Sequence, residues 1–178
     1  MRKIQASGIM NGFGGCAMAK IELVTADVWI KQLEKLSANR DETLGRAIYA
    51  GAAIVADEIR REINALPVQN GVHGSEDRLL DSVTSVQKKG LLDGFGVSKL
   101  KNENGFLNVK LGFDGYNATR TKKYPRGQPN AMIARSINSG TTFRAKRPFV
   151  RNAVRATQNR AIEKMESVLD DEIKKIMK

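Results

Sequence analysis

The chain has 178 residues, of which 41% are hydrophobic, and it carries a formal net charge of +11 with a pI of about 10.0. This length and composition are sufficient for one folded core. The single cysteine excludes an internal disulfide, and no apolar run approaches the roughly 18 residues that a membrane-spanning helix needs. We therefore expect one domain and no membrane partner.

Residues 1–18 are rich in glycine and too polar for the apolar segment of a signal peptide. A glycine-rich terminal segment does not form a core of its own and becomes ordered only when it packs against other residues. We therefore expect an N-terminal arm that lies against a neighbouring subunit. A second start of translation at Met18 is an alternative. Residues 19–178 are expected to form a single domain.

Two helices are predicted in the N-terminal half of that domain. The first lies within residues 19–37, where Trp29, Leu33 and Leu36 recur at helical spacing. A helix of this kind buries one face, so we expect these three side chains to point inward.

The second predicted helix begins after Asn39, which forms a possible capping box with Glu42. Apolar residues then recur every three or four positions as far as Ile63, which is typical of a helix packed on one face. Gly51 weakens this helix but allows a close approach of another backbone. Pro67 is expected to end it, because the residue before a proline is pushed out of helical geometry.

The evidence for strands is strongest in residues 106–113, where apolar and polar side chains alternate. Asn104 and Gly105 precede this segment and form a favoured hairpin turn pair. We expect its partner within residues 94–100, in an antiparallel sheet with one buried face. A short helical or extended piece is expected at residues 78–86.

The C-terminal third combines a long loop with two helices. Residues 115–130 are polar, basic and interrupted by proline, so we predict a loop. Residues 131–138 favour a short helix, and a long helix is predicted to begin at Pro148. The expected fold class is α+β, with an antiparallel β-sheet packed against a long helix of the N-terminal half and a long C-terminal helix.

The positive charge is concentrated between Asp114 and Glu163, where no acidic residue occurs. Ten cations of this region form a predicted surface for an anionic partner, either DNA or an acidic protein. They are Arg120, Lys122, Lys123, Arg126, Arg135, Arg144, Lys146, Arg147, Arg151 and Arg155. Arg151 and Arg155, one helical turn apart, should share a face. The alternative is a solvated face that only keeps the protein soluble.

No residue pattern predicts catalysis. His73 and Cys16 are the only histidine and cysteine, and they do not make a zinc site. The glycine-rich segments 11–15 and 93–97 lack the lysine and the strand–helix context of a phosphate-binding loop. We therefore predict no catalytic residue, no metal and no cofactor, and a protein that is not an enzyme. Sequence-independent binding of DNA is a separate hypothesis, since phosphate contacts need only cations.

Four short motifs resemble a known family. Ile133-Ala134 is followed by Ile137–Thr141, and a basic linker then leads to Pro148–Ala153. Upstream, Pro67–Gly71 is followed by Leu79–Val83. The order and spacing of these motifs resemble the head-to-tail joining, or minor tail component, proteins of long-tailed bacteriophages.

The chain departs from the family pattern at three places. Asn138 stands where the family usually has Glu, Gln69 and Asn70 replace Asp-Thr, and the loop at 115–130 is enlarged. These departures affect any contact that the family's Glu or Asp would make.

The resemblance implies a structural role in the neck or tail-completion region of a virion. It implies a ring, commonly a hexamer, at the head–tail junction, assembled in the host cytoplasm. Its partners would be copies of itself, neighbouring neck or tail-tube proteins, and genomic double-stranded DNA in the channel. The resemblance also assigns structural positions to Pro67, Gly71, Gly140, Thr141, Pro148 and Phe149. Gly140 and Thr141 would allow a sharp turn, Pro148 would start the last helix, and Phe149 would enter the core.

Overall fold

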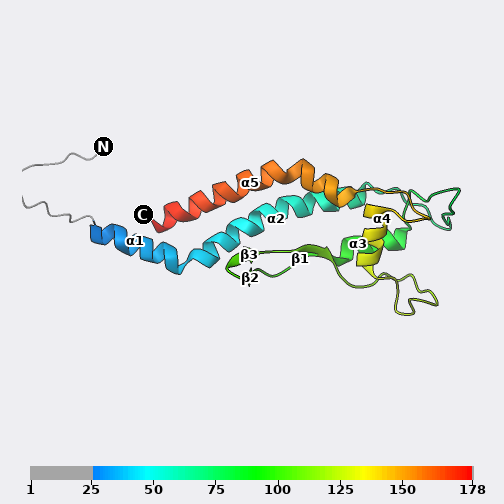
Figure 1. Cartoon of the computed structure of the whole chain (residues 1–178), viewed down its shortest axis with the longest axis horizontal. Coiled ribbons are helices and arrows are strands. Elements are labelled where there is room, and N and C mark those ends of the chain that lie inside the picture. The colour runs from blue at the N-terminus through cyan, green and yellow to red at the C-terminus, as the bar shows by residue number, and fades with distance from the viewer. Residues whose placement is uncertain (1–25, 178) are drawn as a thin grey trace, which may run out of the picture.

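The computed structural model describes residues 26–177, and Figure 1 shows an elongated arrangement of helices with two small sheets. The helices are α1 (Ala26–Ala38), α2 (Arg40–Asn64), α3 (Ser85–Gly94), α4 (Asn130–Ser139) and α5 (Phe149–Ile176). The strands are β1 (Phe95–Val97), β2 (Lys101–Glu103), β3 (Phe106–Asn108) and β4 (Leu111–Phe113). This architecture confirms the α+β class. The predicted arm, residues 1–18, lies outside the described residues.

The long helices α2 and α5 run side by side along the molecule (Figure 1). Their contact contains small buried residues, among them Ala52 and Ala56 of α2 and Ala161 of α5. Gly51 lies in the same contact, where an added Cβ would stand 2.1 Å from Cε of Met165. The close approach predicted at Gly51 is therefore present, but a side chain of α5 makes it rather than a backbone.

The core lies where α3, α4 and the sheet formed by β1 and β4 meet the helix pair. Phe149, at the first turn of α5, is 2% exposed, and its ring lies edge-on to Phe113 at 6.1 Å between centroids. Ile63 of α2, Leu91 of α3 and Ile137 of α4 belong to the same cluster. Helix α5 thus begins inside the core, as the resemblance implied for Phe149.

The end of the molecule far from the C-terminus is formed by α3, α4 and the loops 65–84, 114–129 and 140–148, and we call it the distal end (Figure 1). Helix α2 ends at Asn64, next to the distal end of the molecule. This position, three residues before Pro67, confirms the prediction that the proline ends the helix. Helix α4 confirms the helix predicted at residues 131–138, and residues 115–129 form the predicted loop.

The predicted continuous strand at residues 106–113 is wrong, because its two halves pair with different partners. β4 pairs antiparallel with β1, whereas β3 pairs antiparallel with β2. The break comes where the Ser98 hydroxyl accepts the Lys110 backbone N–H at 2.8 Å, replacing a ladder carbonyl. The hairpin turn is confirmed, with φ of 56° at Asn104 and 86° at Gly105.

The inward face predicted for the first helix is also wrong. Trp29 and Leu33 of α1 are 57% and 55% exposed, and Leu36 is half-buried. The reason is that α1 extends beyond the α2–α5 pair and meets it near its end, where the Gln32 Nε2 donates to the Met177 carbonyl at 2.8 Å.

The capping box predicted at Asn39 is absent, and another one occurs at α3. Helices α1 and α2 are almost continuous, so the Asn39 backbone N–H already donates to the Lys35 carbonyl, and Glu42 pairs with Arg46 instead. At α3 the Thr84 hydroxyl accepts the Gln87 backbone N–H, and the Gln87 side chain accepts the Thr84 N–H. The segment predicted at 78–86 is therefore helical only from Ser85 onward.

We predict that Phe149→Ala lowers the free energy of unfolding by about 3–5 kcal/mol, because it removes a fully buried aromatic side chain from the core. Denaturant unfolding followed by circular dichroism measures this loss. The matched control is Phe106→Ala, since Phe106 is 77% exposed and should change stability by less than about 0.5 kcal/mol. Equal losses for the two variants would contradict the assignment of Phe149 to the core.

Candidate partner-binding surface at the distal end

Three segments that are distant in the sequence meet at the distal end. The Val83 N–H donates to the Pro67 carbonyl at 2.9 Å, so the motif at 67–71 runs beside the motif at 79–83. Leu80 continues the junction through its N–H, which donates to the Phe143 carbonyl at 3.0 Å. These bonds join two of the resemblance motifs to the linker that leads into α5.

Side chains that depart from the family pattern hold this junction together. The Asn70 Oδ1 accepts the Ser85 backbone N–H at 3.0 Å, which ties the loop to the start of α3. The Asn138 Oδ1 accepts the Val150 N–H at 3.3 Å, so the residue that replaces Glu binds one of the first backbone N–H groups of α5. Both contacts need only a short acceptor, and Asn supplies one without a charge.

The turn between α4 and the linker depends on Gly140. Its φ is 77°, a conformation that favours glycine, and its N–H donates to the Ser136 carbonyl at 3.0 Å. Thr141 and Arg144 then exchange backbone hydrogen bonds and reverse the chain. The expected sharp turn is therefore present, and Pro148 occupies the position just before the first residue of α5.

Arg144 differs from the other nine predicted cations because it points into the protein. Its guanidinium Nη1 donates to the Ser82 carbonyl at 2.7 Å, and Nη2 donates to the Gln87 Oε1 at 3.5 Å. Burial lowers the pKa of this guanidinium. Arg144 thus braces the junction between the linker and α3.

The other nine cations are exposed and form no ion pair within residues 26–177. Seven lie at the distal end, on the loop 115–130, on α4 and on the linker before α5. Arg151 and Arg155 continue the series onto the first turns of α5, one turn apart on its exposed side. The structure therefore brings these cations toward one end of the molecule.

The loop 115–130 is internally hydrogen-bonded. The Asn117 N–H donates to the Gln128 carbonyl at 2.9 Å, and the Asn130 Nδ2 donates to the Asp114 carbonyl at 2.8 Å, so the two ends of the loop are fixed together. Gly127 packs against the Asn117 carbonyl with φ of 108°, where a Cβ would clash. Four of the cations, Arg120, Lys122, Lys123 and Arg126, project from this fixed loop.

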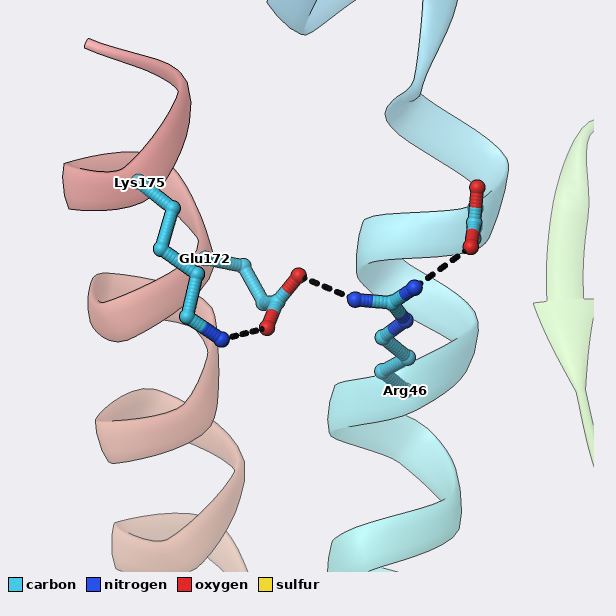
Figure 2. Close-up of polar contacts among 4 residues, drawn as sticks. Arg46, Glu172 and Lys175 are labelled. Carbon is cyan, nitrogen blue, oxygen red and sulfur yellow. Dashed lines mark hydrogen bonds and ion pairs between the residues drawn. The ribbon is translucent and has the colours of Figure 1, made fainter. Parts of the chain in front are cut away.

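The opposite end of the helix pair is held by an ion-pair network (Figure 2). The Glu172 carboxylate of α5 accepts from the Arg46 Nη1 at 2.7 Å and from the Lys175 Nζ at 2.6 Å, and Arg46 also binds Glu42 at 2.6 Å. The hydrogen bond from Lys175, aided by Arg46, lowers the pKa of the Glu172 carboxyl, and Glu172 in turn raises the pKa of Arg46. Only 13% of the Glu172 side chain is exposed.

In the part of the chain that the structure describes, no cluster of three His, Cys, Asp or Glu side chains that could hold a metal ion occurs. His73 is exposed in the loop that follows α2. Between residues 26 and 177, no helix combines the length and apolar character needed to cross a bilayer.

Residues 27–114 match the model of the HK97-gp10-like family, described as "Bacteriophage HK97-gp10, putative tail-component". The match covers α2, α3 and all four strands, and it confirms the resemblance to phage tail-completion proteins. The motifs at 133–141 and 148–153 lie beyond it. No curated protein and no solved structure matches the chain.

We predict that Arg144→Met lowers the free energy of unfolding by about 1–3 kcal/mol, because the Ser82 carbonyl and the Gln87 side chain lose a charged donor at a partly buried site. The control is Arg147→Met in the same linker, where the cation is exposed and the loss should be below about 0.5 kcal/mol. Thermal or denaturant unfolding compares the two variants. An Arg144 variant as stable as the Arg147 variant would show that the bracing contacts contribute nothing.

We also predict a pH-dependent effect of Glu172→Gln. The pKa of Glu172 is lowered on folding from its usual value of 4.5, so its ionised form stabilises the fold above that pH, and this stabilisation is lost as the pH falls through the folded pKa. The melting temperature of the variant should be lower than that of the wild type at pH 7. The difference should shrink toward pH 3.

The control for this measurement is Glu163→Gln, which removes an exposed carboxylate of the same helix that has no ion-pair partner among the described residues. Its melting temperature should stay close to that of the wild type at both pH values. A Glu172→Gln difference that does not change with pH would contradict a role for the ionised carboxylate.

Proposed function

We propose that this chain, whose residues 27–114 match a family of phage tail components, assembles into a ring at the neck or tail-completion region of a virion. The protein is a structural component that acts by binding, without catalysis. The observation that carries this proposal is the family match, because it covers the helix and the sheets around which the rest of the described chain is built.

The distribution of charge supports a partner of negative charge at the distal end. Seven exposed cations at the distal end, none with an ion-pair partner among the described residues, create a positive field that an anionic surface can neutralise. Genomic double-stranded DNA in the channel and an acidic face of a neighbouring neck or tail-tube protein both meet this requirement. The proposed location in the virion is the head–tail junction. The ring is expected to contain six copies and to assemble in the host cytoplasm.

One observation favours a second function, the sequence-independent binding of DNA by the free protein. The loop 115–130 presents four cations on a fixed backbone, and the Lys123 Nζ lies 5.6 Å from the centre of the Tyr124 ring. A cation next to a partly exposed aromatic ring suits contact with nucleic-acid backbones and bases. This candidate requires no ring and no virion.

The test combines virion composition with a neutralised loop. In a phage whose own copy is deleted, the wild-type chain should restore infectivity and appear at the head–tail junction by immunogold electron microscopy. The quadruple variant R120Q/K122Q/K123Q/R126Q should fold normally but restore infectivity poorly. If these cations contact DNA, the slope of log K against log salt should also fall by about 0.9 for each lost phosphate contact.

The matched control neutralises four exposed cations away from the distal end, as K31Q/K35Q/K164Q/K174Q, and should keep infectivity. A chain that is absent from purified virions would refute the structural role. A stable monomer that binds DNA at moderate salt, measured by light scattering and gel shift, would establish the second function instead.

A further inference from the structure

Helix α5 carries an exposed stripe of residues that nothing in the described chain covers. Arg151, Arg155, Ile162, Glu166 and Asp170 are all exposed, and we call them the α5 stripe. Their spacings of four, seven, four and four residues keep them on one side of a helix with 3.6 residues per turn. This side points away from the residues that α5 buries against α2.

Charge along the α5 stripe changes sign once. The two arginines occupy its N-terminal part, the two carboxylates occupy its C-terminal part, and Ile162, 46% exposed, lies between them. None of the four charged side chains forms an ion pair within residues 26–177. Two copies of the stripe that run in opposite directions would therefore place the arginines of each copy opposite the carboxylates of the other.

We propose that the α5 stripe binds the same stripe of a second copy of this chain in an antiparallel, two-fold contact. In this register Arg151 stands opposite the partner's Asp170 and Arg155 opposite the partner's Glu166. The two-fold axis passes between positions 160 and 161, so the two copies of Ile162 lie close to each other at the centre. Because both subunits use the same surface, the contact closes at two chains.

Other occupants fit the stripe less well. A parallel second helix would place Arg151 beside its own equivalent, and like charges side by side are unfavourable. Double-stranded DNA would be repelled by Glu166 and Asp170, and an acidic protein surface would be repelled by the same two carboxylates. Only a partner with the reversed order of charges neutralises both halves, and this chain supplies one.

The expected association is reversible and sensitive to salt. Exposed ion pairs contribute little individually and are screened by salt, and the only large apolar group in the stripe is Ile162. This contact is independent of the proposed ring, because lateral neighbours in a ring with a single rotation axis are not antiparallel. The test of this contact therefore does not depend on whether the chain forms a ring in a virion or binds DNA as a free protein.

The test is a charge swap on the full chain, read by light scattering after size exclusion. At low salt the wild type should show a concentration-dependent shift from 19.6 kDa toward twice that mass, and the shift should weaken at high salt. The variants R151E/R155E and E166R/D170R should each stay monomeric. The combined variant R151E/R155E/E166R/D170R should recover the dimer, because every opposed pair is restored with its signs exchanged.

If the chain also forms larger assemblies, the mass from light scattering no longer identifies the dimer, and a disulfide cross-link then tests the α5 contact directly. In a C16S background, I162C should form a covalent dimer under mild oxidation at low salt, whereas K164C, on another side of α5, should not. The second control, R160E/K164E, reverses two cations outside the stripe and should leave the dimer unchanged. A wild type that remains monomeric, a swap variant that fails to recover the dimer, or equal cross-linking of I162C and K164C would each overturn the proposal.

Discussion

The close packing of α2 against α5 is the constraint on which the described structure depends. The two helices can approach closely because alanine and glycine line much of their contact, and Gly51 leaves space that Met165 fills. Phe149 anchors the pair in the core at one end, and the network of Arg46 with Glu172 links the helices at the other. A hydrophobic anchor and a salt-sensitive bridge thus fix the same pair at opposite ends.

This helix pair also explains how distant motifs meet. The motif at 67–71 follows α2 directly, and the linker at 140–148 precedes α5 directly, so packing the two helices brings both segments to the distal end. The segment at 79–84 then lies between them and accepts backbone bonds from each side. The Arg144 side chain lies inside this junction and donates to the Ser82 carbonyl there, whereas the neighbouring cations of the linker are exposed.

Features determined by local sequence could be predicted, whereas features that depend on a distant partner could not. The end of α2 before Pro67, the turn at Gly140 and the hairpin at Asn104 follow from backbone preferences of those residues, and all three are present. The predicted burial of Trp29 failed because α1 extends past its packing partners. The continuous strand at 106–113 failed because Ser98 ends one ladder, and periodicity cannot show where pairing changes partner.

The same distinction applies to the charged surface. The absence of acidic residues between positions 115 and 162 is visible in the sequence, but the inward direction of Arg144 depends on carbonyl and amide groups that are distant in the chain. On α5, the sequence shows a basic N-terminal part, a C-terminal part that holds all the acidic residues of the helix, and two lysines in the last turn. The buried residues of the helix show which of these side chains face outward. A molecule with a positive distal end and acidic side chains near the C-terminus of its longest helix is electrically polar along its length. In the proposed antiparallel contact, the arginines of each α5 stripe stand opposite the carboxylates of the other, and a distal anion remains accessible because the stripe begins only at Arg151.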